Sequence, residues 1–374
     1  MAGIYLHIPF CKQACFYCDF HFSTSLKHKT NMLDALAKEI ILRTHELKGE
    51  TIQTIYFGGG TPSILNTEEI TDLLELIHTQ FTVNPNAEIT LEANPDDLTS
   101  EKLLQFSKTK INRLSIGVQS FFEEDLKFMN RAHTAKESIE CIQEAKKYFD
   151  NITIDLIYGV PNMSTSKWQE NLNKAFALKV PHISSYALTV EEKTALSSFI
   201  KKGTVKPLDE ALAQEHFNLL ISETKKQGFV HYEISNFGKP AYFSKHNTSY
   251  WQGKTYLGIG PSAHSFNKTQ RSWNIANNQK YIQSIAKGIL PSETETLSAK
   301  DRFNEYIMTG LRTIYGVSLD KIQHDFGIDT HASLLKNAIK FVEQDLLEIK
   351  NNTLLTTSKG KFLADGIASD LFEV

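Results

Sequence analysis

The sequence is poor in cysteine: it has four cysteines in 374 residues. Three of them, Cys11, Cys15 and Cys18, lie close together near the start of the chain, and Cys141 stands far away. So few cysteines exclude a disulfide scaffold for a chain of this length. Clustered thiols in an otherwise cysteine-poor chain indicate a metal or redox site instead.

The sequence also lacks a long apolar run and an excess of charge of one sign. No uninterrupted apolar stretch approaches the roughly 18 residues typical of a membrane span. The formal net charge is −3, so no overall basic field indicates nucleic acid or an anionic membrane as partner. Residues 1–10 show no basic region followed by an apolar core and a cleavage site. We therefore expect a cytoplasmic protein.

What the sequence does have is a regular alternation of strand-like and helical segments over residues 1–190. Asn66 with Glu69, and Thr134 with Glu137, predict helix starts with capping boxes. The alternation predicts an α/β fold with a parallel sheet and right-handed crossovers, either open or closed into a barrel. Six strands are predicted, at residues 3–8, 54–57, 89–93, 113–118, 152–158 and 182–188.

Polar or glycine-rich features follow or end five of these strands. In α/β proteins ligands bind at the carboxyl ends of the strands. We therefore expect the features to converge on one face. They are the cysteine loop, the triple glycine 58–60, Glu92, Gln119 and Asp155.

The regular alternation of strand-like and helical segments ends after residue 191. A long amphipathic helix is predicted at 208–226, whereas 230–260 gives no clear assignment. Two helices at 301–326, a third at 330–345 and a hairpin at 346–357 resemble a winged helix. Residues 301–374 contain eight Lys and Arg against eleven Asp and Glu, which disfavours nucleic-acid binding. We expect three units, at 1–200, 201–295 and 296–374.

The spacing Cys11-x3-Cys15-x2-Cys18 places three thiolates on one short loop. Three ligands suit a four-iron cluster that leaves one iron free to bind something else. One alternative is a zinc site completed by His7, Asp19 or His21. The other is a redox pair formed by Cys15 and Cys18.

Four motifs carry a resemblance to a known family: residues 5–11, 15–20, 57–63 and 258–265. With the cysteine spacing, they resemble the radical S-adenosylmethionine (SAM) superfamily and, within it, the oxygen-independent coproporphyrinogen oxidase group. The resemblance implies a partial (βα)6 TIM-like barrel with a C-terminal α+β winged-helix-like domain. It also implies a [4Fe-4S] cluster on Cys11, Cys15 and Cys18, whose open iron chelates SAM.

The resemblance further implies a SAM site. Gly60 and Thr61 would contact the methionyl part, and Glu92 would receive the ammonium group or a ribose hydroxyl. The planar fork of an arginine suits a carboxylate. The remaining candidates for the ribose and carboxylate, or for weaker contacts, are Gln119, Arg131, Asp155, Tyr5, Tyr17 and Ala187.

Three features place the chain beside the HemW-type heme chaperones rather than the oxidases. Phe20 stands where the oxidases carry a further cysteine, only four residues precede Tyr5, and residues 246–251 match the HNxxYW pattern. Imidazole is a good ligand for heme iron, so His246 is the candidate axial ligand. The resemblance implies heme as cargo, respiratory hemoproteins as acceptors and a possible homodimer. The alternatives are radical decarboxylation of coproporphyrinogen III to protoporphyrinogen IX, and a zinc-stabilised structural protein.

Overall fold

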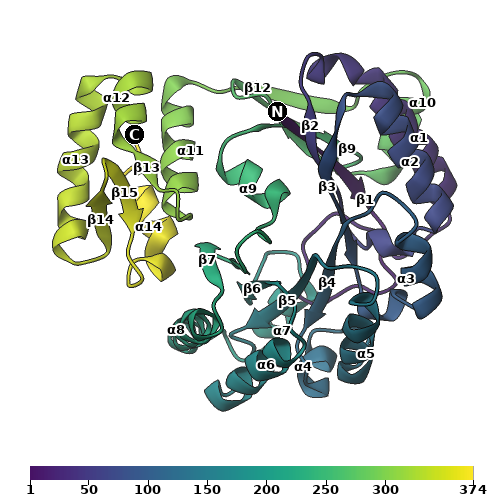
Figure 1. Cartoon of the computed structure of the whole chain (residues 1–374), viewed down its shortest axis with the longest axis horizontal. Coiled ribbons are helices and arrows are strands. Elements are labelled where there is room, and N and C mark those ends of the chain that lie inside the picture. The colour runs from purple at the N-terminus through teal and green to yellow at the C-terminus, as the bar shows by residue number, and fades with distance from the viewer. Residues whose placement is uncertain (374) are drawn as a thin grey trace.

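The structure, a computed structural model, describes residues 1–373. Its centre is a run of six parallel strands that are neighbours in chain order within a twelve-stranded sheet (Figure 1). The predicted α/β architecture and all six strands are confirmed, although the third begins earlier than expected. The strands are β1 (Ala2–Ile8), β2 (Ile52–Gly59), β3 (Val83–Ala93), β4 (Arg113–Gln119), β5 (Ile152–Tyr158) and β6 (His182–Ala187).

Helices connect these strands and cover the outer face of the curved sheet (Figure 1). Asn66 and Thr134 both form capping boxes, which confirms the two predicted helix starts. Two short helices, at Glu123–Phe128 and Ala195–Lys201, were not predicted from the sequence. The helices are α1 (Lys29–Leu42), α2 (Thr67–Gln80), α3 (Ser100–Phe106), α4 (Glu123–Phe128), α5 (Ala135–Ala145), α6 (Thr165–Ala177) and α7 (Ala195–Lys201).

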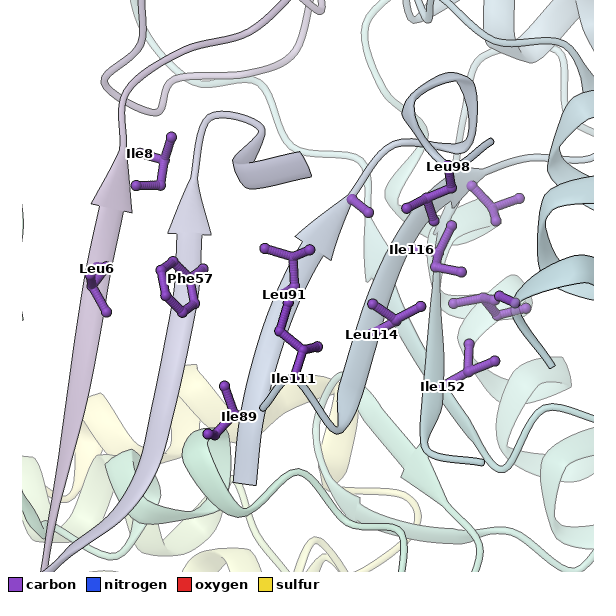
Figure 2. Packing of buried hydrophobic residues seen from close by; sticks show 14 of the residues in the cluster. Leu6, Ile8, Phe57, Ile89, Leu91, Leu98, Ile111, Leu114, Ile116 and Ile152 are labelled. Carbon is purple, nitrogen blue, oxygen red and sulfur yellow. The ribbon is translucent and has the colours of Figure 1, made fainter. Parts of the chain in front are cut away.

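The main hydrophobic core lies between the sheet and these helices. Alternate residues of a strand point to opposite faces, so one side of each strand is apolar and the other can be polar. Figure 2 shows Leu6, Phe57, Leu91 and Leu114 side by side on neighbouring strands, all fully buried. The opposite, concave side of the same strands carries charged and polar residues, and the candidate site lies there.

The six strands do not close on each other; the sheet continues at both edges instead. Beyond β1 it adds β9 (Thr255–Ile259), parallel to β1, and then three antiparallel strands. Beyond β6 it adds β8 and β7. The segment that gave no prediction, residues 230–260, thus supplies the two strands at one edge of the sheet and the first strand beyond β1 on the other side. Its elements and neighbours are α8 (Glu210–Lys226), β7 (Val230–Glu233), β8 (Asn236–Gly238), α9 (Lys245–Trp251), β10 (His264–Phe266), β11 (Gln270–Asn274), α10 (Asn278–Ala286) and β12 (Ser292–Thr296).

The glycine-rich motif at residues 258–265 connects β9 to β10 and is hydrogen-bonded to side chains at the end of α1. Arg43 donates to the carbonyl oxygen of Gly258 over 2.8 Å and to the hydroxyl of Ser265 over 3.0 Å. The backbone nitrogen of Gly260 donates to buried Glu39 over 2.8 Å. The charges of Arg43 and Glu39 are paired with each other, as burial requires. This motif holds the sheet extension in place.

The C-terminal elements pack around a separate hydrophobic core that includes Phe303, Ile307 and Leu334. The three predicted helices and the hairpin are present, with a further strand and a further helix, and Figure 1 shows them as a separate lobe. The unit boundary at residue 296 stays a prediction. The elements are α11 (Ala299–Leu311), β13 (Val317–Ser318), α12 (Leu319–Phe326), α13 (Ile328–Glu343), β14 (Leu347–Lys350), β15 (Thr353–Thr356) and α14 (Ala364–Asp370). Among residues 1–373, no helix has the length and apolar character to span a membrane.

Candidate functional site

A cavity of about 670 Å³ lies at the carboxyl ends of the parallel strands. This is the face on which the sequence predicted the polar features to converge. Eleven of the thirteen predicted site residues line it; Tyr5 and His246 are the exceptions. The eleven are Cys11, Cys15, Tyr17, Cys18, Gly60, Thr61, Glu92, Gln119, Arg131, Asp155 and Ala187.

The cysteine loop runs along one wall of the cavity, and two of its sulfur atoms receive hydrogen bonds. Thr61 Oγ1 donates to Cys11 Sγ over 3.5 Å, and Arg131 Nη1 donates to Cys15 Sγ over 3.4 Å. Burial raises the pKa of Cys11 to about 11 and that of Cys18 to about 12. Without a metal, burial thus favours the protonated thiols of Cys11 and Cys18; with one, Thr61 and Arg131 would stabilise the thiolates of Cys11 and Cys15. The residues present fit a thiolate-held cluster.

The geometry removes two of the three ligands proposed for the zinc alternative, His7 and His21, whereas Asp19 lines the cavity. His7 Nε2 donates to the carbonyl oxygen of His21 over 2.8 Å, and His21 Nε2 donates to Asn278 over 2.7 Å. Both imidazoles are thus engaged away from the sulfur atoms, and neither lines the cavity. Within residues 1–373, no group of three His, Cys, Asp or Glu side chains is placed to hold a single metal ion.

The triple glycine brings β2 against the cysteine loop. The backbone nitrogen of Gly60 donates to Ile8 over 2.9 Å, and that of Thr61 donates to Phe10 over 2.7 Å. A Cβ atom on Gly60 would lie 2.5 Å from the Phe10 carbonyl oxygen, so only glycine fits. The sequence predicted that these glycines either allow the backbone to approach a ligand or form a tight turn. In the structure, the backbone of Gly60 closely approaches Phe10 in the cysteine loop.

Two acidic side chains line the cavity, Glu92 from β3 and Asp155 from β5. Glu92 accepts a hydrogen bond from the Tyr56 hydroxyl over 2.7 Å. Asp155 accepts one from Ser115 over 3.4 Å. Burial raises the pKa of Glu92 to about 7 and that of Asp155 to about 6. A cationic ligand would favour the ionised form of both groups.

Arg131 links the cysteine loop to the strand ends. Its Nη2 atom donates to Asn94 over 2.6 Å and to the Gly117 carbonyl oxygen over 2.7 Å. Its Nε atom is buried without a partner. Most of the guanidinium donors of Arg131, which the sequence analysis assigned to a ligand carboxylate, are therefore already bonded within the protein. Gln119 lines the cavity beside it with a φ of 68°, a strained value of the kind found at binding sites.

Tyr5 lies behind the cavity wall. Its hydroxyl is 3.2 Å from His7 Nδ1, and its ring stacks on Tyr56 with centroids 6.1 Å apart. Its packing against Gly58 and Tyr56 explains why it does not line the cavity.

His246 lies at the other end of the strands, beside Gly3 at the start of β1. Its Nδ1 atom is 2.7 Å from the Thr54 hydroxyl, and its Nε2 atom is 2.7 Å from the Tyr250 hydroxyl. The side chain is 1% exposed. The structure therefore does not bring His246 together with the other predicted site residues.

Sequence reasoning missed two groups of residues at the cavity. Asn94 follows β3 directly, and this position at a strand end is a signal that was available; Ser115 lies within β4 and shares a face with Gly117. The C-terminal lobe supplies the second group, which carried no signal because it is distant in the sequence: Arg312, Lys361, Phe362 and Asp365.

The chain is similar to proteins of known families over its whole length. Residues 5–175 match the family described as the radical SAM superfamily, and residues 297–363 match the HemN C-terminal domain. It is 32% identical to the heme chaperone HemW of Lactococcus lactis, with 97% of each chain covered. It is also 32% identical to the heme chaperone HemW of Bacillus subtilis, with 98% of each covered.

Among solved structures, the coproporphyrinogen III oxidase HemN of Escherichia coli has the same fold. The TM-score is 0.85 at 23% identity, over 99% of this chain and 90% of that one. The likeness confirms the fold expected from the sequence, including a C-terminal domain. The family is shown by the curated relatives, which are 32% identical over nearly the whole chain: the protein belongs to the HemW family of the radical SAM superfamily.

Proposed function

We propose that the protein is a heme chaperone that binds a [4Fe-4S] cluster, SAM and heme and delivers the heme to acceptor hemoproteins. The proposal is supported by the name that the curated relatives share, "heme chaperone HemW", over nearly the whole chain. The observation that carries it within the structure is the gathering of Cys11, Cys15 and Cys18 at one cavity with the candidate SAM residues.

Cys11, Cys15 and Cys18 would hold the cluster, with Thr61 and Arg131 donating hydrogen bonds to two of the sulfur atoms. When bound, the cluster supplies an iron without a protein ligand, open to the amino and carboxylate groups of SAM. The acidic side chains of Glu92 and Asp155 would face the positive charge of SAM. Gln119, Tyr17, Gly60 and Ala187 would complete the walls around it.

Phe20 favours the chaperone over the oxidase. It occupies the position where the sequence resemblance places a further cysteine of the oxidases, and it lines the cavity with 65% of its surface exposed. The likeness to HemN is one of fold, at 23% identity. Coproporphyrinogen oxidation is therefore the outcome that the functional test must exclude. A cytoplasmic location, a homodimer and respiratory hemoproteins as acceptors belong to the same proposal.

The experiment is heme transfer from the full-length protein to an apo-hemoprotein, followed by the acceptor's absorption spectrum. We expect transfer from heme-loaded wild type, and a changed rate or yield in Cys15→Ala, which would lack the cluster. Cys141→Ser is the matched control because Cys141 is buried inside α5, away from the cavity. Absence of transfer under all conditions would contradict the chaperone proposal. Repeated turnover of coproporphyrinogen III with SAM and reductant would favour the oxidase.

A further inference from the structure

The cavity has two chemically different ends. The end at the cysteine loop carries Arg131, Glu92 and Asp155. The other end lies against the C-terminal lobe and is lined by two cations, Arg312 and Lys361. Aromatic and aliphatic side chains also line the cavity: Phe20, Phe22, Ile157, Leu188, Phe217 and Phe362.

Lys361 is a partly buried cation with only neutral acceptors as direct partners. Its Nζ atom is 3.0 Å from His231 Nδ1 and 3.2 Å from the His231 carbonyl oxygen. Burial lowers its pKa to about 8, and no carboxylate among residues 1–373 lies within ion-pair distance of it. A partly desolvated ammonium group in this position gains free energy when an anion approaches.

Arg312 has a similar surplus of donors. It forms an ion pair with Asp365, a residue whose side chain is 62% exposed, and its Nε atom is buried without a partner. Exposed ion pairs contribute little, so Asp365 can be displaced at small cost. The other acids nearby are Glu191, which is exposed, and Glu233, which is buried and bonded to Asn236. Burial raises the pKa of Glu233, whereas the nearby charges of Arg312 and Lys361 lower it.

Trp251, the last residue of the HNxxYW segment, does not line the cavity but contacts Arg312, which does. The guanidinium carbon of Arg312 lies 5.0 Å from the centre of the Trp251 ring, within the range of a cation–π contact. The backbone of Ile234 also bonds to the Arg312 carbonyl oxygen over 3.0 Å. Trp251 is thus a positioning residue: it fixes the plane of the guanidinium that faces the cavity.

Phe217 on α8 and Phe362 in the C-terminal lobe pack against each other, with ring centroids 5.6 Å apart. They join the barrel and the lobe at the apolar wall beside the two cations. The combination of flat apolar surface and two cations lining the same cavity matches a planar, apolar molecule that carries two carboxylates at one edge. Aromatic rings offer such a molecule stacking surface, and arginine and lysine bind carboxylates.

We propose that Arg312 and Lys361 bind the two propionate carboxylates of heme, with the macrocycle against the aromatic wall that joins barrel and C-terminal lobe. This proposal rests on the proposed function, because it takes heme as the ligand. It assigns the heme site to the same cavity as the cluster, and it gives the C-terminal lobe a direct part in binding.

The test compares heme with heme dimethyl ester, in which both carboxylates are neutral, by absorption titration of the full-length protein. We expect Lys361→Gln and Arg312→Gln each to weaken heme binding about tenfold or more, the effect of losing a charge-assisted hydrogen bond. The same variants should bind the ester as wild type does. Lys361→Arg should retain most of the affinity for heme, and circular dichroism checks that each variant is folded.

The matched controls are Lys359→Gln and Arg302→Gln, which remove a positive charge from exposed positions of the same lobe outside the cavity. Both should bind heme as wild type does. Equal affinity of wild type and the two cavity variants for heme would overturn the carboxylate site, as would an equal loss for heme and ester. Failure of wild type to bind heme at all would instead overturn the proposed function.

A separate experiment tests the positioning role of Trp251. Trp251→Leu should weaken heme binding by less than Arg312→Gln does. It should cause little further loss when the two are combined, because both remove the same interaction. Fully additive losses would show that Trp251 acts elsewhere and would remove its positioning role.

Discussion

The imidazole of His246 is 2.7 Å from the hydroxyl of Tyr250, one turn later on α9. Its other ring nitrogen is 2.7 Å from the Thr54 hydroxyl, so both nitrogens are engaged within the protein. The backbone nitrogen of His246 donates to Glu88 over 3.0 Å. Burial lowers the pKa of the ring to about 3, which keeps it neutral at physiological pH. These contacts are those of a structural histidine that fastens α9 to the barrel.

His246→Ala should therefore act on stability first. Loss of two buried hydrogen bonds and of packing should lower the free energy of unfolding by about 2–4 kcal/mol, measured by denaturant titration. The exposed neighbour Lys245 is the control, and Lys245→Ala should change stability by less than about 0.5 kcal/mol. We expect the heme absorption spectrum to stay unchanged. An altered spectrum at unchanged stability would instead support the iron-ligand role predicted from the HNxxYW motif.

The three loop cysteines should behave as one unit. Replacing Cys11, Cys15 or Cys18 by Ala should reduce the iron content after anaerobic reconstitution from about four per chain to a small fraction, because each thiolate is a cluster ligand. Iron analysis and the brown absorption of the cluster measure this. Cys141→Ser should retain wild-type iron. Full iron in all three loop variants would argue that the cluster is held elsewhere.

Local patterns made the barrel predictable. The apolar strands and the capping residues Asn66 and Thr134 act over a few residues, and the structure confirms them. The segment from Val230 to Gly260 could not be assigned from the sequence, because its strands are short and pair with strands that are distant in the sequence. Pairing of that kind leaves no local periodicity to detect.

The same distinction separates the parts of the candidate site. The carboxyl-end rule located Glu92, Gln119 and Asp155 because it depends only on strand order. It could not locate Arg312 and Lys361, whose place at the cavity depends on how the C-terminal lobe docks on β7 through Glu233 and Thr313. Docking between units is a property of tertiary packing, and no short motif encodes it.

SAM binding should depend on pH through Glu92. Its pKa of about 7 means that the carboxyl is largely neutral at pH 6 and largely ionised at pH 8. The affinity of the cluster-loaded protein for positively charged SAM should therefore rise about tenfold over this range. Glu92→Gln should weaken binding at pH 8 and flatten the pH profile, whereas Glu68→Gln, at an exposed position on α2, should change neither. Calorimetric titration at three pH values measures this.

Glu92→Gln should weaken SAM binding at pH 8 but should make the fold more stable at that pH. Because the folded-state pKa of Glu92 lies above its ordinary value of 4.5, its contribution to folding is fully present below pH 4.5 and is lost as the pH rises through about 7. Glu92→Gln removes this loss, so the variant without ligand should melt at a higher temperature than wild type at pH 8. A lower melting temperature at that pH would show that ionised Glu92 is stabilised by contacts that outweigh its burial.

Gly60→Ala should displace the cysteine loop. The new Cβ would lie 2.5 Å from the Phe10 carbonyl oxygen, and backbone on both sides leaves no flexible side chain to yield. We expect a loss of about 1–3 kcal/mol in the free energy of unfolding and a lower yield of cluster. Gly366→Ala, on α14 with nothing within 4 Å of the new methyl group, should leave stability equal or slightly higher. If Gly60→Ala matched that control in both stability and iron content, the contact between the triple glycine and the loop would not be needed to shape the cluster site.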